Sequence, residues 1–150
     1  MSDLSDLYQE VILDHNRRPR NFHALGDASH SAEGYNPLCG DRITLYLCIE
    51  DGVVKDVGFE GAGCAIATAS ASLMTEALKG RTEAEVEALF ERFHAMATAP
   101  ADRPVSNEGL GKLAVLAGVR EFPARIKCAT LAWHTLHAAL RDERGTVSTE

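Results

Sequence analysis

Apolar residues near the start of the chain recur at the three- and four-residue spacing of an amphipathic helix. Over residues 4–17 they form one stripe, made of Leu4, Leu7, Tyr8, Val11 and Ile12. We expect this helix to end near Arg17, because Pro19 disfavours helical backbone angles in the residue before it. The pattern over residues 21–34 is weaker, and residues 28–33 are expected to form an edge strand.

Alternation of apolar and polar residues over 42–61 indicates an antiparallel hairpin. The apolar positions are Ile43, Leu45, Leu47 and Ile49 in the first strand and Val53, Val57 and Phe59 in the second. A two-residue turn at Asp51–Gly52 would place these two sets on opposite faces of the sheet. A three-residue loop over residues 50–52 would pair Ile49 with Val53 and place both sets on one face. We therefore expect the longer loop, with a left-handed Gly52.

Four helices are expected after the hairpin. The first begins at Cys64 and runs to about residue 79, and Thr82 and Glu85 form a capping box for the second. A short helix over 110–117 and a long one from Pro123 to about residue 142 complete the set, and residues 144–150 are expected to fray. The chain 1–150 is thus predicted to be a single α+β domain. Its small antiparallel sheet of about three strands packs against about five helices.

The composition changes this picture by excluding several classes of function. The chain has 150 residues, of which 45% are apolar and 25% charged, as in ordinary globular domains. The formal net charge of −7 argues against nucleic-acid binding, which depends on an excess of Lys and Arg. No apolar run approaches the roughly 18 residues of a membrane span, and the N-terminus does not resemble a secretion signal. We expect a cytoplasmic protein whose cysteines are reduced thiols or metal ligands.

Three cysteines and one aspartate are candidate ligands of a single zinc ion, which prefers thiolates, accepts a carboxylate and is usually tetrahedral. The four residues are Cys39, Asp41, Cys64 and Cys128. The first two share a short loop, which Pro37 and Gly40 make tight. The other two stand at or near predicted helix starts, where the helix dipole lowers a thiol pKa, and Gly63 precedes Cys64.

The residues alone leave this zinc site open against simpler readings. The chain contains no C-x-x-C pair, so three unrelated buried thiols are as good an interpretation, and Asp41 could equally cap a turn. Basic residues that neighbour the candidate ligands in sequence could offset their negative charge; these are Arg42, Arg125 and Lys127. Cys48 is interpreted as an ordinary strand cysteine on the face away from the core. His134 and His137 are interpreted as a helix-surface pair rather than metal ligands.

Four motifs, which together span nearly the whole chain, resemble the IscU-like family of iron–sulfur cluster assembly proteins, the family of the NifU N-terminal domain. They are centred on Asp14-His15…Pro19-Arg20-Asn21, Asn36-Pro37-Leu38-Cys39-Gly40-Asp41, Gly61-Ala62-Gly63-Cys64 and Arg125-Ile126-Lys127-Cys128. Two features favour the SufU branch of this family. Lys127 stands where IscU scaffolds carry a histidine, and the segment between the last two motifs is long, with the extra length expected within 93–110.

The resemblance implies a zinc-dependent sulfurtransferase of the SufU type, with an IscU/SufU-like fold. In that branch zinc is bound by the residues that correspond to Cys39, Asp41, Cys64 and Cys128. Cys39 would accept persulfide sulfur from a cysteine desulfurase of the SufS type after a desulfurase histidine displaces it from zinc. The sulfur would then pass to a downstream Suf scaffold. Arg125, Lys127, Gly40 and Gly63 are expected to support the site.

Two alternatives to this function stay open. One is a scaffold that assembles a transient [2Fe–2S] cluster on the same cysteines, which Lys127 in place of histidine disfavours. The other is a small zinc-stabilised binding module without transfer chemistry, which the loop around Cys39 disfavours, because structural zinc sites are usually closed.

Overall fold

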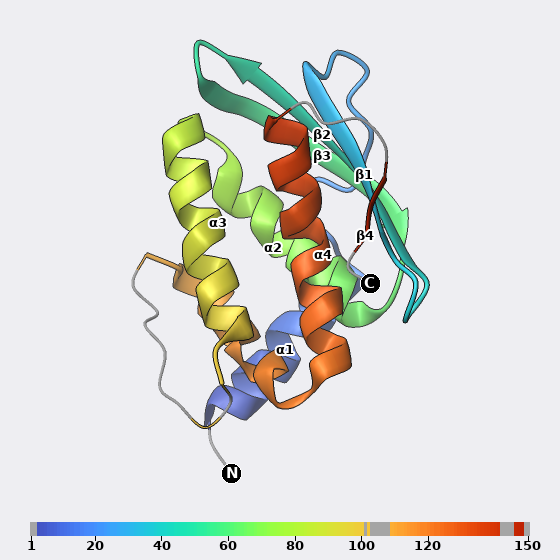
Figure 1. Cartoon of the computed structure of the whole chain (residues 1–150), viewed down its shortest axis with the longest axis vertical. Coiled ribbons are helices and arrows are strands. Elements are labelled where there is room, and N and C mark those ends of the chain that lie inside the picture. Colours follow the sequence, from blue (N-terminus) through green and yellow to red (C-terminus); the bar gives the residue numbers. More distant parts are fainter. Residues whose placement is uncertain (1–2, 101, 103–108, 142–145, 149–150) are drawn as a thin grey trace.

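The computed structural model describes residues 3–100, 102, 109–141 and 146–148 (Figure 1). Its elements are α1 (Asp3–Arg17), β1 (His30–Asn36), β2 (Asp41–Glu50), β3 (Val53–Ala62), α2 (Ala65–Leu78), α3 (Glu83–Thr98), the 3₁₀ helix η1 (Gly111–Glu121), α4 (Pro123–Leu140) and β4 (Thr146–Ser148). The α+β class and the antiparallel sheet β3-β2-β1 are confirmed, and the described residues form five helices beside it. No helix among the described residues has the length and apolar character needed to cross a membrane.

The helices stack on the sheet in layers, as Figure 1 shows. Helices α2 and α4 contact the strands, α1 packs on α2, and α3 packs on α4 and η1. All helix starts and ends lie near their expected places except that η1 continues past Gly118 to Glu121. The predicted capping box is confirmed: the Thr82 side chain accepts a hydrogen bond from the Glu85 N–H, and the Glu85 carboxylate accepts one from the Thr82 N–H.

The expected three-residue hairpin loop is wrong. The turn consists of Asp51 and Gly52 alone, both with positive φ (53° and 74°), and Ile49 lies opposite Val54. Two consecutive left-handed residues are the mark of the tight turn that suits the twist of paired strands. The left-handed conformation expected for Gly52 is confirmed.

A β-bulge, rather than a longer loop, places the apolar residues of β2 and β3 on the same face of the sheet. The pairing register shifts between Cys48 and Ile49, which leaves Lys55 without a partner on β2. The extra residue reverses the alternation in β3, so that Val54 and Val57 both face the core with no exposed surface. Cys48 lies on the other face of the sheet, beside Asp27, as predicted.

The C-terminal tail also differs from its expectation. Residues 146–148, expected to fray, form β4, which pairs in parallel with residues 33–35 of β1. A strand edge offers unpaired N–H and C=O groups, and this short segment satisfies part of that edge. Three residues are too few to show an alternating pattern in the sequence. The rest of the tail, and residues 101 and 103–108 of the segment expected to hold extra length, lie outside the described residues.

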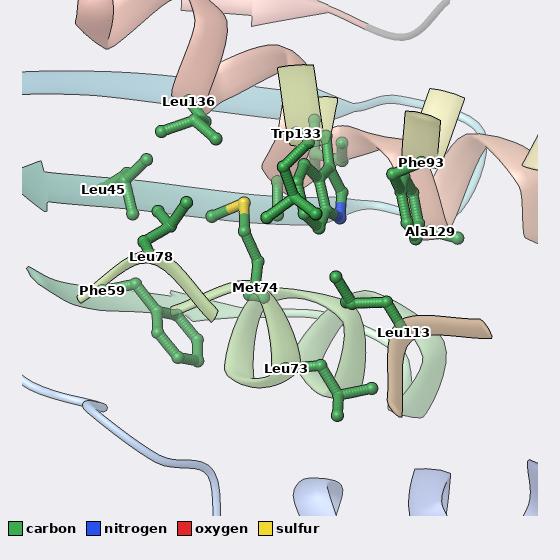
Figure 2. Packing of buried hydrophobic residues seen from close by; sticks show 14 of the residues in the cluster. Leu45, Phe59, Leu73, Met74, Leu78, Phe93, Leu113, Ala129, Trp133 and Leu136 are labelled. Atoms are coloured by element: carbon green, nitrogen blue, oxygen red, sulfur yellow. The ribbon is translucent and has the colours of Figure 1, made fainter. Parts of the chain in front are cut away.

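The centre of the core is a stacked aromatic pair on α3 and α4. The rings of Phe93 and Trp133 lie 4.4 Å apart at an interplanar angle of 12°, and both side chains are completely buried (Figure 2). The Trp133 indole N–H donates to Ser70 Oγ (3.2 Å), and this hydroxyl donates to the Ala129 carbonyl (2.6 Å). The buried polar atoms are therefore paired, and they tie α2 to α4.

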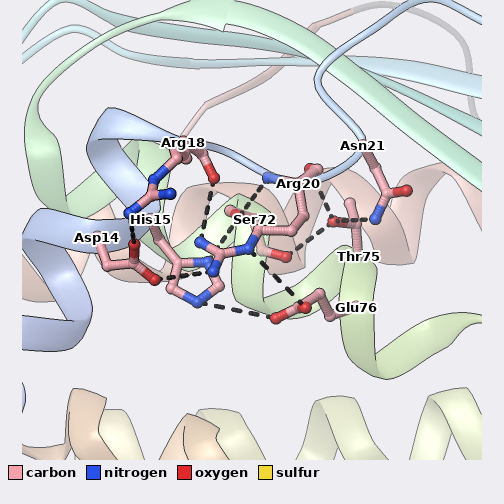
Figure 3. Close-up of polar contacts among 8 residues, drawn as sticks. All are labelled: Asp14, His15, Arg18, Arg20, Asn21, Ser72, Thr75 and Glu76. Carbon is pink, nitrogen blue, oxygen red and sulfur yellow. Dashed lines mark hydrogen bonds and ion pairs between the residues drawn. The ribbon is translucent and has the colours of Figure 1, made fainter.

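Helix α1 is held to α2 by a buried polar network around His15, shown in Figure 3. His15 Nδ1 lies 2.7 Å from Ser72 Oγ, and this hydroxyl also accepts a hydrogen bond from the Arg20 backbone N–H (2.8 Å). The Arg20 guanidinium pairs with Asp14 (2.8 Å). Burial lowers the pKa of the His15 imidazole below its ordinary value, although the carboxylate of Glu76 opposes this. The network thus favours a neutral histidine.

We predict that this network makes stability fall in acid. Because the folded-state pKa of His15 is lowered, the unfolded chain binds the proton first; the contribution of His15 is full above about pH 6.5 and is lost as pH falls below it. His15→Gln should be less stable than wild type at pH 7, by about 1–3 kcal/mol for the broken pairing. It should also show a smaller loss of stability between pH 7 and 5. Urea unfolding at both pH values measures this, with the exposed His23→Gln as control.

An equal loss of stability in wild type and His15→Gln over this pH range would contradict the prediction that protonation of His15 destabilises the fold. His134, whose pKa burial also lowers, contributes with the same sign and remains in both proteins. Only the difference between them reports on His15.

Candidate metal centre

Cys39, Asp41 and Cys128 meet at one point although they are far apart in sequence. Their possible ligand atoms all lie within 4.8 Å of one another, and the sulfur atoms of Cys39 and Cys128 are 3.4 Å apart. Cys39 comes from the loop between β1 and β2, Asp41 begins β2, and Cys128 lies in the second turn of α4. Asp41 and Cys128 are buried, whereas Cys39 is exposed.

Cys64 stands at the edge of this cluster. It is the N-cap of α2, where its sulfur accepts a hydrogen bond from the Ala67 N–H (3.4 Å). The same sulfur lies 4.0 Å from Asp41 Oδ2. The fold thus brings three of the four predicted ligands together, Cys39, Asp41 and Cys128, while Cys64 lies outside this group and approaches it through Asp41.

The carboxylate of Asp41 is buried but fully paired. Its Oδ1 accepts a hydrogen bond from the Cys64 backbone N–H (2.8 Å), and its Oδ2 accepts one from the Asn36 side-chain amide (3.0 Å). Gly63 makes this approach possible, because a Cβ atom added there would come within 2.6 Å of Asp41 Oδ1. Gly40, in contrast, has open space around it and is needed for its positive φ of 76°.

Asn36 is a site residue that reasoning from the sequence missed. It is completely buried, and its amide nitrogen lies 3.5 Å from the Cys128 sulfur as well as 3.0 Å from Asp41. In the sequence, an asparagine before a proline is an ordinary turn signal. Its place at the start of the motif that carries Cys39 and Asp41 is the signal that could have raised interest in it.

Cys64 and Cys128 shift each other's acidity in opposite directions. The neighbouring Cys128 thiol lowers the pKa of Cys64 to about 7, with further help from the Ala67 N–H at the helix start. The Cys64 thiol, together with burial and the neighbouring Asp41, raises the pKa of Cys128. A bound cation would favour the deprotonated form of both thiols.

Two of the three basic residues expected to offset the negative charge of the candidate ligands stack on aromatic rings. Arg125 is exposed and stacks on the Phe122 ring (4.2 Å), and Arg42 lies over the Tyr35 ring (4.6 Å). Lys127 is half-buried on α4. In the described part of the chain, no ion pair joins these residues to Asp41. The carboxylate is paired instead by neutral N–H donors.

The remaining candidates lie away from the cluster. Cys48 is on the opposite face of the sheet, as its interpretation required. His134 and His137 pack around the Phe90 ring, and His137 Nε2 accepts a hydrogen bond from Arg141 (2.9 Å). Neither histidine belongs to a group of three or more possible metal ligands within the described residues.

An open groove of about 580 Å³ leads to the cluster. Its walls come from Gln9, Ile12 and Leu13 of α1 and from the starts of α2 and α4, and the sulfur-bearing residues Cys39, Cys64 and Cys128 lie along it. Leu13, on the groove wall, is 48% exposed, and Leu38, which precedes Cys39 in the chain, is 61% exposed. Exposed apolar surface next to a reactive thiol is suited to contact with another protein.

The donor set fits a zinc ion. Three sulfurs and one carboxylate oxygen are the ligand types that zinc accepts in tetrahedral sites. With Zn–S bonds of about 2.3 Å, tetrahedral ligand atoms lie about 3.8 Å apart. The separations of 3.4 Å between Cys39 and Cys128 and 4.0 Å between Cys64 and Asp41 are close to this value.

A family model and individual relatives all place this chain in the same protein family. A family model described as the NifU-like N-terminal domain matches residues 7–129. The zinc-dependent sulfurtransferase SufU of Bacillus subtilis is 41% identical over 145 residues, which are 96% of each chain. The iron–sulfur cluster assembly scaffold protein IscU of Thermotoga maritima is 44% identical over 138 residues, which cover 90% of this chain and 93% of the relative.

A solved structure agrees with these relatives. The crystal structure described as an iron–sulfur cluster assembly scaffold protein for the SUF system of Fervidobacterium islandicum AW-1 superposes with a TM-score of 0.82. It is 32% identical, and the match covers 90% of this chain and 97% of that one. The fold and the cluster assembly family are therefore shared, while the relatives carry two different functional names.

We predict that Gly63→Ala damages the site through Asp41. The added methyl group would overlap the carboxylate, which has no room to move because both of its oxygens are bonded. The free energy of unfolding should fall by about 1–3 kcal/mol, as for other overpacked sites. Gly26→Ala is the matched control, since nothing lies within 4 Å of its added Cβ. Equal urea midpoints for wild type and Gly63→Ala would show that the Asp41 carboxylate can tolerate a methyl group at residue 63.

Proposed function

The chain belongs to the family of the NifU-like N-terminal domain, and we propose that it acts there as a zinc-dependent sulfurtransferase. It accepts a persulfide sulfur atom from a cysteine desulfurase of the SufS type and passes it towards a downstream Suf scaffold. One observation carries the proposal: of the three cysteines in the cluster, only Cys39 is exposed, and it lies on a loop that opens into an apolar groove. The four cysteines are free thiols, which fits the reducing cytoplasm.

The proposed ligands are Cys39, Asp41, Cys64 and Cys128. When bound, zinc would supply the positive charge that keeps several neighbouring thiols deprotonated at neutral pH. Cys64 and Cys128 are anchored on helices α2 and α4, and Asp41 is held by two hydrogen bonds. These three residues can keep their places while the Cys39 loop moves.

The exposed sulfur of Cys39, when deprotonated, is the proposed nucleophile of the transfer step. Its thiolate would attack the outer sulfur of the desulfurase persulfide. The S–S bond of the donor breaks, the donor cysteine leaves as a thiolate, and a persulfide forms on Cys39. One S–S bond breaks and one S–S bond forms, so the step needs no oxidant or reductant. The groove beside Leu13 and Leu38 is the surface that we assign to the desulfurase.

A scaffold function is the second candidate, since relatives of similar identity are named as IscU scaffolds. Cys39, Cys64 and Cys128 could bind the irons of a [2Fe–2S] cluster. Against this, Lys127 stands where the scaffold branch carries its histidine, and a lysine ammonium has no free electron pair for a metal. The two candidates differ in the metal that they hold, which can be measured directly.

We predict one zinc per chain in the purified protein. Cys64→Ser and Cys128→Ser should lose zinc and thermal stability together, because the free energy of metal binding is partly folding free energy. Cys48→Ser is the matched control and should keep both, since Cys48 lies on the far face of the sheet. Metal analysis and melting curves give the answer. A brown protein with about two irons and two sulfides per chain would instead support the scaffold.

We also predict that Cys39→Ser folds and abolishes sulfur transfer. A serine hydroxyl can remain a poor ligand but cannot form a persulfide, so the desulfurase should lose its stimulation while part of the zinc remains. The test uses labelled cysteine, the desulfurase and this protein, with the label located by peptide mass analysis. Label on Cys64 or Cys128, or full stimulation by Cys39→Ser, would show that the acceptor is another residue. Stimulation without any label would favour a binding module.

A further inference from the structure

Asn36 bonds both to the loop that carries Cys39 and to the groups behind it. Its backbone carbonyl accepts a hydrogen bond from the Gly40 N–H (2.8 Å), and its side-chain oxygen accepts one from the Leu38 N–H (3.3 Å). The two residues that flank Cys39 therefore both donate to Asn36. These bonds close the loop on itself and direct Cys39 towards the cluster.

The other end of the same side chain faces the buried part of the site. The amide nitrogen donates to Asp41 Oδ2 (3.0 Å) and lies 3.5 Å from the Cys128 sulfur. A side-chain amide has two N–H groups, so one residue can serve both acceptors. Asn36 has no exposed surface, and both the oxygen and the nitrogen of its amide are used. Because both polar atoms of this side chain are paired, a substitution that removes one of them leaves a buried partner without its hydrogen bond.

We propose that Asn36 is the positioning residue that separates the moving part of the site from the fixed part, an inference that rests on the proposed function. Its oxygen restrains the Cys39 loop through the single, longer bond to Leu38. Its nitrogen keeps Asp41 and Cys128 oriented whether or not the loop is closed. When the desulfurase draws Cys39 out, the Leu38 bond is the one to break, and the two acceptors behind it keep their donor.

Two substitutions separate these two tasks. Asn36→Ala removes both the oxygen and the nitrogen. Asn36→Asp keeps an oxygen for the Leu38 N–H but replaces the donor by a second oxygen, which faces the Asp41 carboxylate and the Cys128 sulfur. Thr75→Val is the matched control: Thr75 is also fully buried and hydrogen-bonded, but it lies eleven residues beyond Cys64 at the far end of α2, about 16 Å along the helix.

The experiment measures two rates on the purified protein. The first is zinc transfer to a chromogenic chelator, and the second is hydrogen exchange of the Leu38 amide by NMR. Both Asn36 variants should release zinc about tenfold faster or more, the usual effect of losing a residue that orients metal ligands. The Leu38 amide should exchange faster only in Asn36→Ala. Thr75→Val should lower the melting temperature without changing either rate.

The proposal is overturned if both Asn36 variants keep the wild-type zinc release, or if Thr75→Val accelerates it equally. It is also overturned if Leu38 exchanges at the wild-type rate in Asn36→Ala. If Asn36→Asp fails to fold, the comparison of Asn36→Ala with the Thr75→Val control still decides the outcome. A failure of the proposed function looks different: wild type would carry no zinc or would not take up sulfur, while the Leu38 measurement would still test the restraint of the loop.

Discussion

The buried carboxylate of Asp41 is the constraint on which the site depends. A carboxylate taken out of water without partners costs several kcal/mol, on the order of the stability of a small domain. Here one oxygen is paired by the backbone N–H that begins α2 and the other by the amide of Asn36. These two bonds connect the start of β2, the start of α2 and the end of β1. The position of Cys64 is thus coupled to that of Asp41 by the backbone itself.

The core supplies the rigid frame behind this junction. The stacked Phe93 and Trp133 rings and the Ser70 hydroxyl hold α3, α4 and α2 together, and the buried His15 network ties α1 to α2 (Figures 2 and 3). Cys64 and Cys128 sit on the ends of this frame. Cys39 does not: its loop joins β1 to β2, its two neighbours donate to Asn36, and its sulfur lies 3.4 Å from that of Cys128. Which cysteine is buried and which is exposed is therefore a consequence of the element that carries it.

Neutral donors rather than cations pair the acidic groups of the site. Arg42 and Arg125 stack on aromatic rings at the surface, and Arg125 faces the groove. N–H donors pair a carboxylate without adding a charge, whereas a salt bridge would neutralise it and compete with a bound cation. Arg125 lies on the wall of the groove, where Leu13 exposes apolar surface.

Local patterns in the sequence were enough for the fold class and the helix starts, and three of the four candidate ligands, Cys39, Asp41 and Cys128, do meet in the fold. The span of α1, the Thr82–Glu85 capping box and the alternation in β2 are short-range signals, and each forms as expected. The Asp51–Gly52 turn is also a local signal, but the bulge at Lys55, which makes this turn compatible with one buried face, and the pairing of β4 with β1 were not predictable in this way. Each is decided by which face of a strand is buried or which edge is free, and both depend on elements distant in the chain. The same holds for Asn36, whose amide is an ordinary turn signal until the fold brings Cys128, 92 residues away, to within 3.5 Å of it.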